Sequence, residues 1–405
     1  MSLSSAQTEN APLDTRRGLF AHPLWLVGFR PFFALAFVSA VVMPLVWALV
    51  MSGAVQLPEG VASPVRWHAH EMLFGFGWAV LGGFLLTASK NWVGIRGLHG
   101  GPLAFAVVLW CVERVAVLLS PDLLPAPVRF LLVHGFALYV VGYVVWTLVR
   151  YRKQDSFSDN GFFIVGLPLF LVARVLVDAE GAELHATGIA LTVGLFRLAF
   201  AVMFERTMTQ FMKNAAGVTL PRWRWLDHSI KGLVLLAAFE ALLPPTVAAI
   251  VLAAAAVLLF ARLLTWKPLL GLRTFAIGIM YAGYFGLVVH LVLAALTRAQ
   301  LYAGIGTLAL HAFTFLTMGL IIPPMFIRIC QGHTGRKLLF TTSDRVAMAL
   351  MAAGAFFRLV ATQLWPQHYL TFISLAAAGW CLCFAIIGVR LLPFLFKARV
   401  DGREH

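Results

Sequence analysis

Five histidines of the sequence lie inside long apolar stretches or at their edges, where an imidazole needs a partner or a function. They are His68, His70, His134, His290 and His311. Imidazole is the commonest protein ligand for haem iron and copper in helix bundles, where ligands project inward from facing helices. The alternative is that each ring makes a hydrogen bond between two helices. Several such rings at one depth favour a haem or metal site.

Buried arginines point to the same chemistry. The apolar stretches contain Arg114, Arg174, Arg197 and Arg358. The carboxylates that could pair with them are fewer, namely Glu71, Glu113 and Glu240. Haem carries two propionates, which arginine binds with two parallel hydrogen bonds. Pairing with protein carboxylates and binding of an anionic substrate are the alternatives for each arginine.

The composition shows which elements must position these residues. Of the 405 residues, 61% are hydrophobic and 12% are charged, and the 33 phenylalanines outnumber the 31 lysines and arginines. A soluble protein has about 25% charged residues, so we expect an integral membrane protein made of helices. The net charge of +14 does not indicate nucleic-acid binding, because the basic residues lie between apolar segments, as they do for membrane topology. No phosphate-binding or dinucleotide-binding loop is visible.

The apolar stretches predict an all-α transmembrane bundle of about twelve helices, because about 20 apolar residues cross a bilayer. We expect one membrane domain over 26–396, an N-terminal cytoplasmic segment 1–25 and a cytoplasmic tail 397–405. The predicted spans are roughly 26–51, 67–89, 101–120, 127–150, 160–178, 184–212, 228–243, 245–266, 273–298, 302–328, 343–363 and 369–396.

Lysines and arginines outside these spans or at their ends predict that both termini are cytoplasmic. Three lie on the opposite side, namely Arg66, Arg129 and Arg298. Eighteen lie on the cytoplasmic side: Arg16, Arg17, Lys90, Arg96, Arg150, Arg152, Lys153, Lys213, Arg222, Arg224, Lys267, Arg273, Arg336, Lys337, Arg345, Lys397, Arg399 and Arg403.

This orientation gathers the five histidines in the outer half of the bilayer. His311, for example, lies about nine residues into its helix, or ~14 Å. His68 and His70 are two residues apart, or about 200° on a helix, so they cannot bind one metal from one face. We therefore expect His70 and His311 to be an axial pair, and His68, His134 or His290 to serve a second metal.

Other residues complete the sequence-based expectations. The four cysteines (Cys111, Cys330, Cys381 and Cys383) fall in apolar stretches, which argues against disulfides and against a zinc site, and we expect Cys381 and Cys383 to be small buried side chains. The remaining histidines outside the loop 332–336 are expected to be solvated: His22, His99, His185, His228, His368 and His405.

His70 precedes Gly94 by the same 24 residues that separate His311 from Gly335, which would suit a four-helix unit repeated three times.

Four motifs resemble the NnrS family over Phe20 to Phe396. They are Gly28-Phe29-Arg30-Pro31-Phe32-Phe33, Trp67-His68-Ala69-His70-Glu71-Met72, Gly82-Gly83-Phe84-Leu85-Leu86-Thr87-Ala88 followed by Asn91-Trp92, and Gly332-His333-Thr334-Gly335-Arg336. Where the family usually has Asn-Trp-Thr-Gly-Arg, this chain has Asn91-Trp92-Val93-Gly94-Ile95-Arg96.

The resemblance implies a bacterial inner-membrane protein that carries haem b and copper and takes part in the response to nitric oxide. It adds Trp67 and Glu71 to the expected cofactor environment, beside the histidines and Arg114, Arg174 and Arg358. It also provides secondary site candidates at matching motif positions, namely His333, Arg336, Arg30, Asn91, Trp92 and Arg328.

We therefore expect a haem-containing membrane protein that binds nitric oxide and protects against nitrosative stress. A nitric-oxide-metabolising oxidoreductase would take electrons from membrane quinol, with Gly332–Arg336 or the Arg30 region as head-group sites. The rival predictions are a transporter or chaperone for haem, copper or iron-nitrosyl species, and a bundle whose histidines only join helices.

Overall fold

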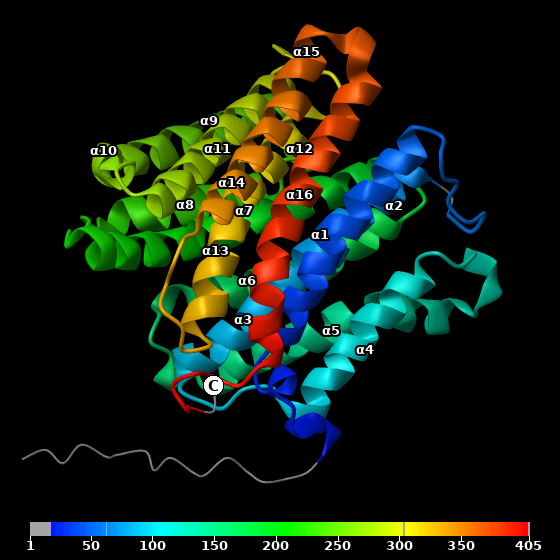
Figure 1. Cartoon of the computed structure of the whole chain (residues 1–405). Coiled ribbons are helices and arrows are strands. Elements are labelled where there is room, and N and C mark those ends of the chain that lie inside the picture. The colour runs from blue at the N-terminus through cyan, green and yellow to red at the C-terminus, as the bar shows by residue number, and fades with distance from the viewer. Residues whose placement is uncertain (1–17, 62, 303, 404–405) are drawn as a thin grey trace, which may run out of the picture.

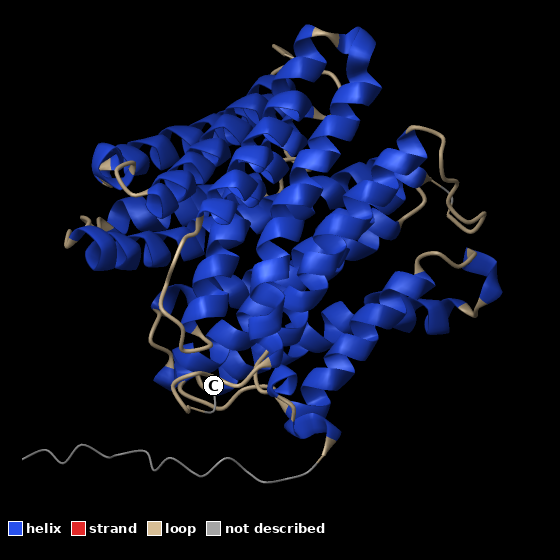
Figure 2. Cartoon of the chain, in the orientation of Figure 1, coloured by secondary structure: helices blue, strands red, loops and turns tan. Residues whose placement is uncertain are grey.

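The protein is helical throughout the residues that the structure, a computed structural model, describes: 18–61, 63–302 and 304–403. Helices account for nearly all regular structure, and these residues form no strand (Figure 2). A backbone in lipid must satisfy its N–H and C=O groups internally, and a helix does so within one segment. The expectations that concern Arg16, Arg17 and His405 lie outside the described residues.

Within the described residues, ten helices have the length and apolar composition to cross a membrane. They cover Phe29–Met51, Pro64–Val93, Ala126–Arg150, Ser158–Asp178, Ala182–Ala216, Pro245–Thr265, Phe275–Arg298, Leu308–Gly332, Thr342–Leu364 and Pro366–Phe396. The third and seventh expected spans are shorter helices: Gly100–Ala116 has 17 residues and Arg224–Ala237 has 14.

The helices form three consecutive groups (Figure 1). The first contains α1 (Phe29–Met51), α2 (Pro64–His70), η3 (Glu71–Gly77), α3 (Trp78–Val93), α4 (Gly100–Ala116) and α5 (Ala126–Arg150). The second contains α6 (Gly161–Asp178), α7 (Ala182–Ala216), α8 (Arg224–Ala237) and α9 (Pro245–Thr265), followed by the short α10 (Pro268–Gly271). The third contains α11 (Phe275–Arg298), α12 (Leu308–Ala312), η7 (Phe313–Met318), α13 (Gly319–Gly332), α14 (Thr342–Phe356), η8 (Phe357–Ala361), α15 (Thr362–Leu364) and α16 (Tyr369–Phe396).

The packing of these groups repeats three times around the molecule. Within each group the first helix packs on the second segment, as α1 does on α3, α6 on α7 and α11 on α13. The third and fourth also pack together, as in α4 with α5, α8 with α9 and α14 with α16. The fourth helix of each group then packs on the first of the next, and α16 closes the ring by packing on α1. The repeat suggested by the histidine-to-glycine spacing is therefore present in the packing.

A glycine with positive φ follows the second segment of each group. Gly94 and Gly217 are the C-caps of α3 and α7, with φ values of 69° and 65°, whereas Gly335 lies beyond the C-cap of α13, with a φ of 74°. Glycine adopts this left-handed conformation without a Cβ clash, and at a C-cap it ends the helix. In addition, the π-helical segment η3 begins directly after His70, and η7 begins at Phe313, two residues after His311. Such a segment rotates the rest of a helix relative to the residues before it and is frequent at functional sites.

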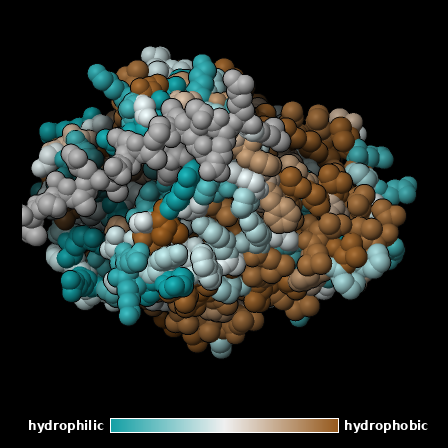
Figure 3. All heavy atoms as spheres, turned by 90° about the horizontal axis from the view of Figure 1, so that it is seen from below, coloured by the Kyte–Doolittle hydropathy of each residue, from teal (hydrophilic) through white to brown (hydrophobic). Residues whose placement is uncertain are grey.

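The bundle has two opposite ends. The terminal end is where α1 begins and α16 ends, near the label C in Figure 1. The histidine end is the opposite one, where α2 and α12 begin. Viewed from below, toward the terminal end, apolar side chains cover the right and lower flanks, and polar side chains gather on the left (Figure 3). Apolar flanks are what contact with lipid requires.

Candidate functional site

One arginine joins two of the five histidines at the histidine end. The Arg174 guanidinium, on α6, donates from Nε to Nδ1 of His134 at 3.0 Å and lies 3.0 Å from Nε2 of His70 through NH2. The other nitrogen of His70 is 3.3 Å from the Glu71 carboxylate. Arg174 thus lies between two imidazoles, where a cation bound by both would lie. We call His70, His134 and Arg174, with the acidic residues Glu71, Glu113 and Asp178 and the basic Arg114, the His70 cluster.

The carboxylates of the His70 cluster neutralise its arginines. Arg174 contacts Glu113 at 2.7 Å, and Arg114 contacts Glu71 at 3.0 Å and also Glu113. Glu113 and Arg174 are fully buried, and Glu71 is nearly so. A buried charge is tolerated when it is paired and hydrogen-bonded. Neither Arg114 nor Arg174 therefore needs the carboxylate of a cofactor.

A cavity of about 690 Å³ reaches the His70 cluster from the histidine end. Its polar lining includes His70, His134, Arg66, Arg129 and Asp178. Trp67, which is buried, also lines it. His70 Nε2 and His134 Nε2 lie 3.7 and 3.9 Å from the Asp178 carboxylate. The cavity therefore gives small polar molecules a path to the two imidazoles.

A second group, the His311 cluster, contains His68, His311 and Arg358. Arg358 NH2 lies 3.0 Å from His311 Nδ1 and donates to the carbonyl of Gly306 at 2.5 Å. His68 stacks on Trp47 with 4.4 Å between ring centroids. His68 is within electrostatic range of both Arg358 and His311. The structure thus places His68 with His311, and His70 with His134.

The His311 cluster is not internally satisfied. Arg358 is 5% exposed, and among the described residues it contacts no carboxylate. Its NH1 nitrogen is buried without a hydrogen-bond partner, and so is Nδ1 of His68. Arg114 and Arg174 also have buried nitrogens without hydrogen-bond partners, but each of them contacts a carboxylate. An anion beside Arg358 would supply the partner that the described chain lacks.

His290 belongs to neither cluster. Its Nδ1 lies 2.7 Å from the carbonyl of Ala309, and its Nε2 lies 3.5 Å from Arg197. Arg197 is fully buried, 3.5 Å from Glu240, and donates to the carbonyl of Ala237. This histidine therefore joins α11 to the start of α12 and has the helix-pairing role considered for every histidine.

At the terminal end, four of the six secondary candidates line one cavity of about 450 Å³: Asn91, Trp92, Arg328 and His333. Trp92 stacks on Phe163, with 5.6 Å between centroids. Burial, followed by the positive charges of Lys90, Arg399 and Arg30, lowers the pKa of His333 to about 4. His333 is therefore neutral at pH 7.

The other two secondary candidates contact the end of the chain. Arg30 is fully buried and donates from NH1 to the carbonyls of Leu395 at 2.9 Å and Lys397 at 2.7 Å. It thereby ties the start of α1 to the end of α16. Arg336 lies over the Phe394 ring at 4.1 Å, and burial lowers its pKa. Both arginines hold the terminal end together.

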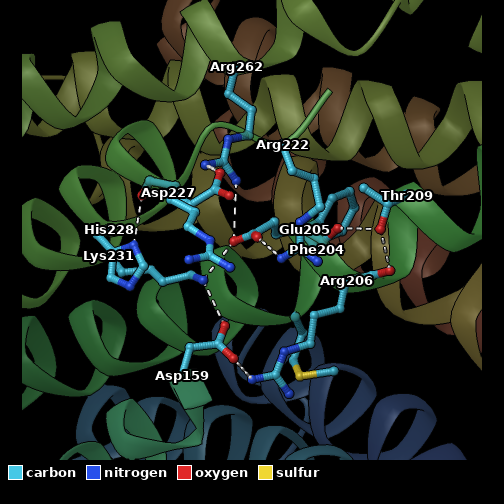
Figure 4. Close-up of polar contacts among 12 residues, drawn as sticks. Asp159, Phe204, Glu205, Arg206, Thr209, Arg222, Asp227, His228, Lys231 and Arg262 are labelled. Atoms are coloured by element: carbon cyan, nitrogen blue, oxygen red, sulfur yellow. Dashed lines mark hydrogen bonds and ion pairs between the residues drawn. The ribbon is translucent and has the colours of Figure 1, made fainter. Parts of the chain in front are cut away.

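A buried network of ion pairs near the terminal end was not expected from the sequence (Figure 4). Lys231 of α8 contacts Asp159 at 2.7 Å and Glu205 at 2.6 Å. Each carboxylate also contacts arginines from other segments. These pairs are Asp159 with Arg206, Glu205 with Arg222 and Arg262, and Asp227 with Arg262. The polar residues of the spans 184–212 and 228–243 were the available signal, because charges in an apolar stretch need partners.

The described residues contain no group of three or more histidine, cysteine, aspartate or glutamate side chains placed to hold a metal ion. The four cysteines carry free thiols, as expected, and of the two that were expected to be buried, Cys383 is buried and Cys381 is half-buried. Haem iron takes few ligands from the protein, because the porphyrin surrounds the iron and the protein supplies axial ligands.

The family model described as NnrS protein matches residues 23–399, nearly the whole chain. The chain belongs to the NnrS family. No curated protein matches it. NnrS membership confirms the resemblance carried by the four motifs. Three of them place residues at sites described above: His68 and His70 in the two histidine clusters, and Asn91 and His333 in the cavity of the terminal end.

Proposed function

We propose that this NnrS protein holds haem b at the histidine end and binds nitric oxide there, as part of protection against nitrosative stress. The His311 cluster supports the proposal best. His68 and His311 are imidazoles within electrostatic range of each other, and Arg358 is a buried guanidinium that contacts no carboxylate of the described residues. A haem propionate would satisfy Arg358, as the charge comparison in the sequence anticipates.

The residues of the His311 cluster are of the types that hold haem. His68 and His311 are half-buried, and Nδ1 and Nε2 of His311 lie 3.0 and 3.5 Å from Arg358. The unpartnered Nδ1 of His68 has a free ring position, whereas both nitrogens of His70 are engaged by Arg174 and Glu71. His68 and His311 would therefore hold the haem, and Arg358 would orient it through a propionate. Bound haem supplies an iron atom that binds diatomic ligands. The pairing of His70 with His311 stays a prediction that the same variants test.

Topology forms part of the proposal. We propose twelve membrane-crossing helices, with α4 and α8 as the two shorter ones, and cytoplasmic termini in a bacterial inner membrane. The excess of lysine and arginine at the terminal end supports this orientation. Copper rests on the family resemblance alone, because it takes several protein ligands and the described residues do not group them.

The first experiment is an optical spectrum of the purified protein, oxidised, reduced with dithionite, and reduced in the presence of nitric oxide. Haem and copper are quantified on the same sample. Stoichiometric haem whose reduced bands shift with nitric oxide is the expected result. A colourless protein after haem-supplemented expression would contradict the proposal and favour transport or a structural bundle.

Histidine variants then assign the ligands. His311→Ala and His68→Ala should each reduce haem content, whereas His290→Ala should retain it. The matched controls are His228→Ala and His368→Ala, because both rings are exposed at the ends of helices. Unchanged haem in both His311→Ala and His68→Ala would exclude the His311 cluster as the haem site. Loss of haem in His70→Ala and His311→Ala, with haem retained in His68→Ala, would instead support the axial pair of His70 and His311 expected from the sequence.

A further inference from the structure

Two adjoining cavities follow the middle of the molecule from its centre to the terminal end. The inner one, of about 100 Å³, is enclosed by apolar side chains of α1, α3, α7 and α13, with Thr207 as its polar residue. The outer one, of about 450 Å³, contains the family-motif residues. The two share six lining residues: Phe33, Phe84, Met203, Thr207, Met325 and Ile329. The two cavities therefore adjoin, the inner one apolar and the outer one with a polar mouth.

The polar mouth contains three side chains that have hydrogen-bonding capacity to spare. Within the part of the chain that the structure describes, Asn91, Arg328 and the ring of His333 form no side-chain hydrogen bond. Arg328 lies with its guanidinium 3.4 Å from the centroid of the Phe211 ring, and no carboxylate lines the cavity. Polar groups that converge on an apolar cavity without bonding to each other are typical of a ligand site.

The chemistry of the lining specifies the ligand. Arginine only donates hydrogen bonds, and the asparagine amide donates two, so the mouth suits acceptor oxygens. The neutral His333 can either donate or accept. The walls contain the aromatic rings of Phe29, Phe84, Trp92 and Phe211, which suit a flat ring. A flat ring with acceptor oxygens and an apolar tail is a quinone, and its reduced form keeps the same shape.

We propose that this space binds a membrane quinone or quinol. The ring lies in the outer cavity with its oxygens on Asn91, Arg328 and His333, and the first carbons of its tail enter the inner cavity. The choice of a redox lipid rests on the proposed function, because a haem that binds nitric oxide in its reduced state needs an electron source. Binding itself depends on the cavity residues and can be measured without haem.

The test is isothermal titration of the purified full-length protein, in neutral detergent, with a decyl-substituted benzoquinone. Saturable binding at one site per chain is expected. Asn91→Ala and His333→Ala should each weaken it about tenfold, since each removes one hydrogen bond that a bound ligand would leave unmatched. His333→Gln, which keeps a donor and an acceptor, should restore most of the affinity.

A second variant tests the apolar interior. Ala199 lines the inner cavity, and Ala199→Phe should fill it and weaken binding without changing the polar mouth. His228→Ala is the control, because this exposed ring lies away from the cavity lining. Each variant must elute and melt as the parent protein does before its affinity counts.

Three outcomes would overturn the proposal: no saturable binding, equal affinity in the parent and in both alanine variants of the mouth, or displacement of the quinone by an equal concentration of phosphatidylglycerol. Haem content is measured on every sample. Loss of quinone affinity with haem retained supports a separate site. A protein that binds quinone but no haem contradicts the proposed function and leaves the cavity assignment in place.

Discussion

The ion-pair network near the terminal end and the His311 cluster are both buried groups of charged or polar side chains, but only in the network does every cation contact a carboxylate of the described residues. In the network, Lys231 contacts two carboxylates, and each of these contacts arginines as well. In the His311 cluster, Arg358 has two imidazoles and a carbonyl nearby but no carboxylate among the described residues.

The difference indicates that the network stabilises the packing of the helices, whereas the His311 cluster is suited to binding a ligand. A buried charge that is removed from water costs several kcal/mol unless partners compensate for it. The network has these partners, and its members come from helices α7, α8 and α9 and from the segments before α6 and α8, so it joins helices. In the His311 cluster, no carboxylate of the described residues compensates the charge of Arg358. A bound ligand that carries a carboxylate can supply the partner that the described residues do not provide.

The largest effect should follow from breaking the network. Lys231→Met leaves Asp159 and Glu205 with fewer cations and should cost about 3–5 kcal/mol of unfolding free energy. Thermal unfolding in detergent measures it, with the exposed Lys213→Met as control. A melting temperature equal to that of the control would show that the network does not stabilise the helices. Haem content of the folded fraction should be unchanged.

The His70 cluster should resemble the network. Arg174→Met removes one of the two arginines that contact the buried Glu113 and leaves His70 and His134 without their shared donor. A loss of about 3 kcal/mol is expected, at the low end for a broken buried pair, because Arg114 remains. The control is Arg273→Gln, which is exposed. Stability equal to that of the control would indicate that the His70 cluster, like the His311 cluster, is a site for a ligand and does not stabilise the fold.

Arg358→Gln should have the opposite effect to Lys231→Met, namely a small loss of stability and a large loss of haem. It removes a guanidinium that has no carboxylate, so only about 1 kcal/mol of stability should be lost, mainly the hydrogen bond to Gly306. Haem content, measured by the reduced-minus-oxidised spectrum, should fall well below that of the parent. Full haem retention together with a large loss of stability would contradict the distinction between the two regions.

The smallest effect concerns pH at the terminal end. The pKa of His333 is lowered to about 4, so the folded protein keeps this ring neutral while the unfolded chain binds a proton near pH 6.5. Its contribution to stability is therefore present above about pH 6.5 and is lost as the pH falls toward about 4. His333→Gln should make the melting temperature less dependent on pH over this range. A dependence equal to that of the parent would assign the loss to other groups.

The sequence predicts the helical class, most span positions and the family motifs, because apolar length and charge outside the helices are local properties. It does not predict which histidine meets which arginine. That pairing depends on helix rotation, which the π-helical segments after His70 and His311 alter. The two-residue spacing of His68 and His70 does predict that they face different centres, and the structure places them in different clusters. The network was missed because four of its charged residues fell inside apolar spans and the others in loops, and nothing in the sequence shows that they meet.

The contacts of Arg30 also bear on how the chain is assembled. Arg30 is near the start of α1, and its acceptors, the carbonyls of Leu395 and Lys397, are synthesised 365 residues later or more. During synthesis this guanidinium must keep other partners, such as water or lipid phosphate, until α16 arrives. Insertion of α16 therefore closes the ring of helices and replaces the temporary partners of Arg30 in the same step.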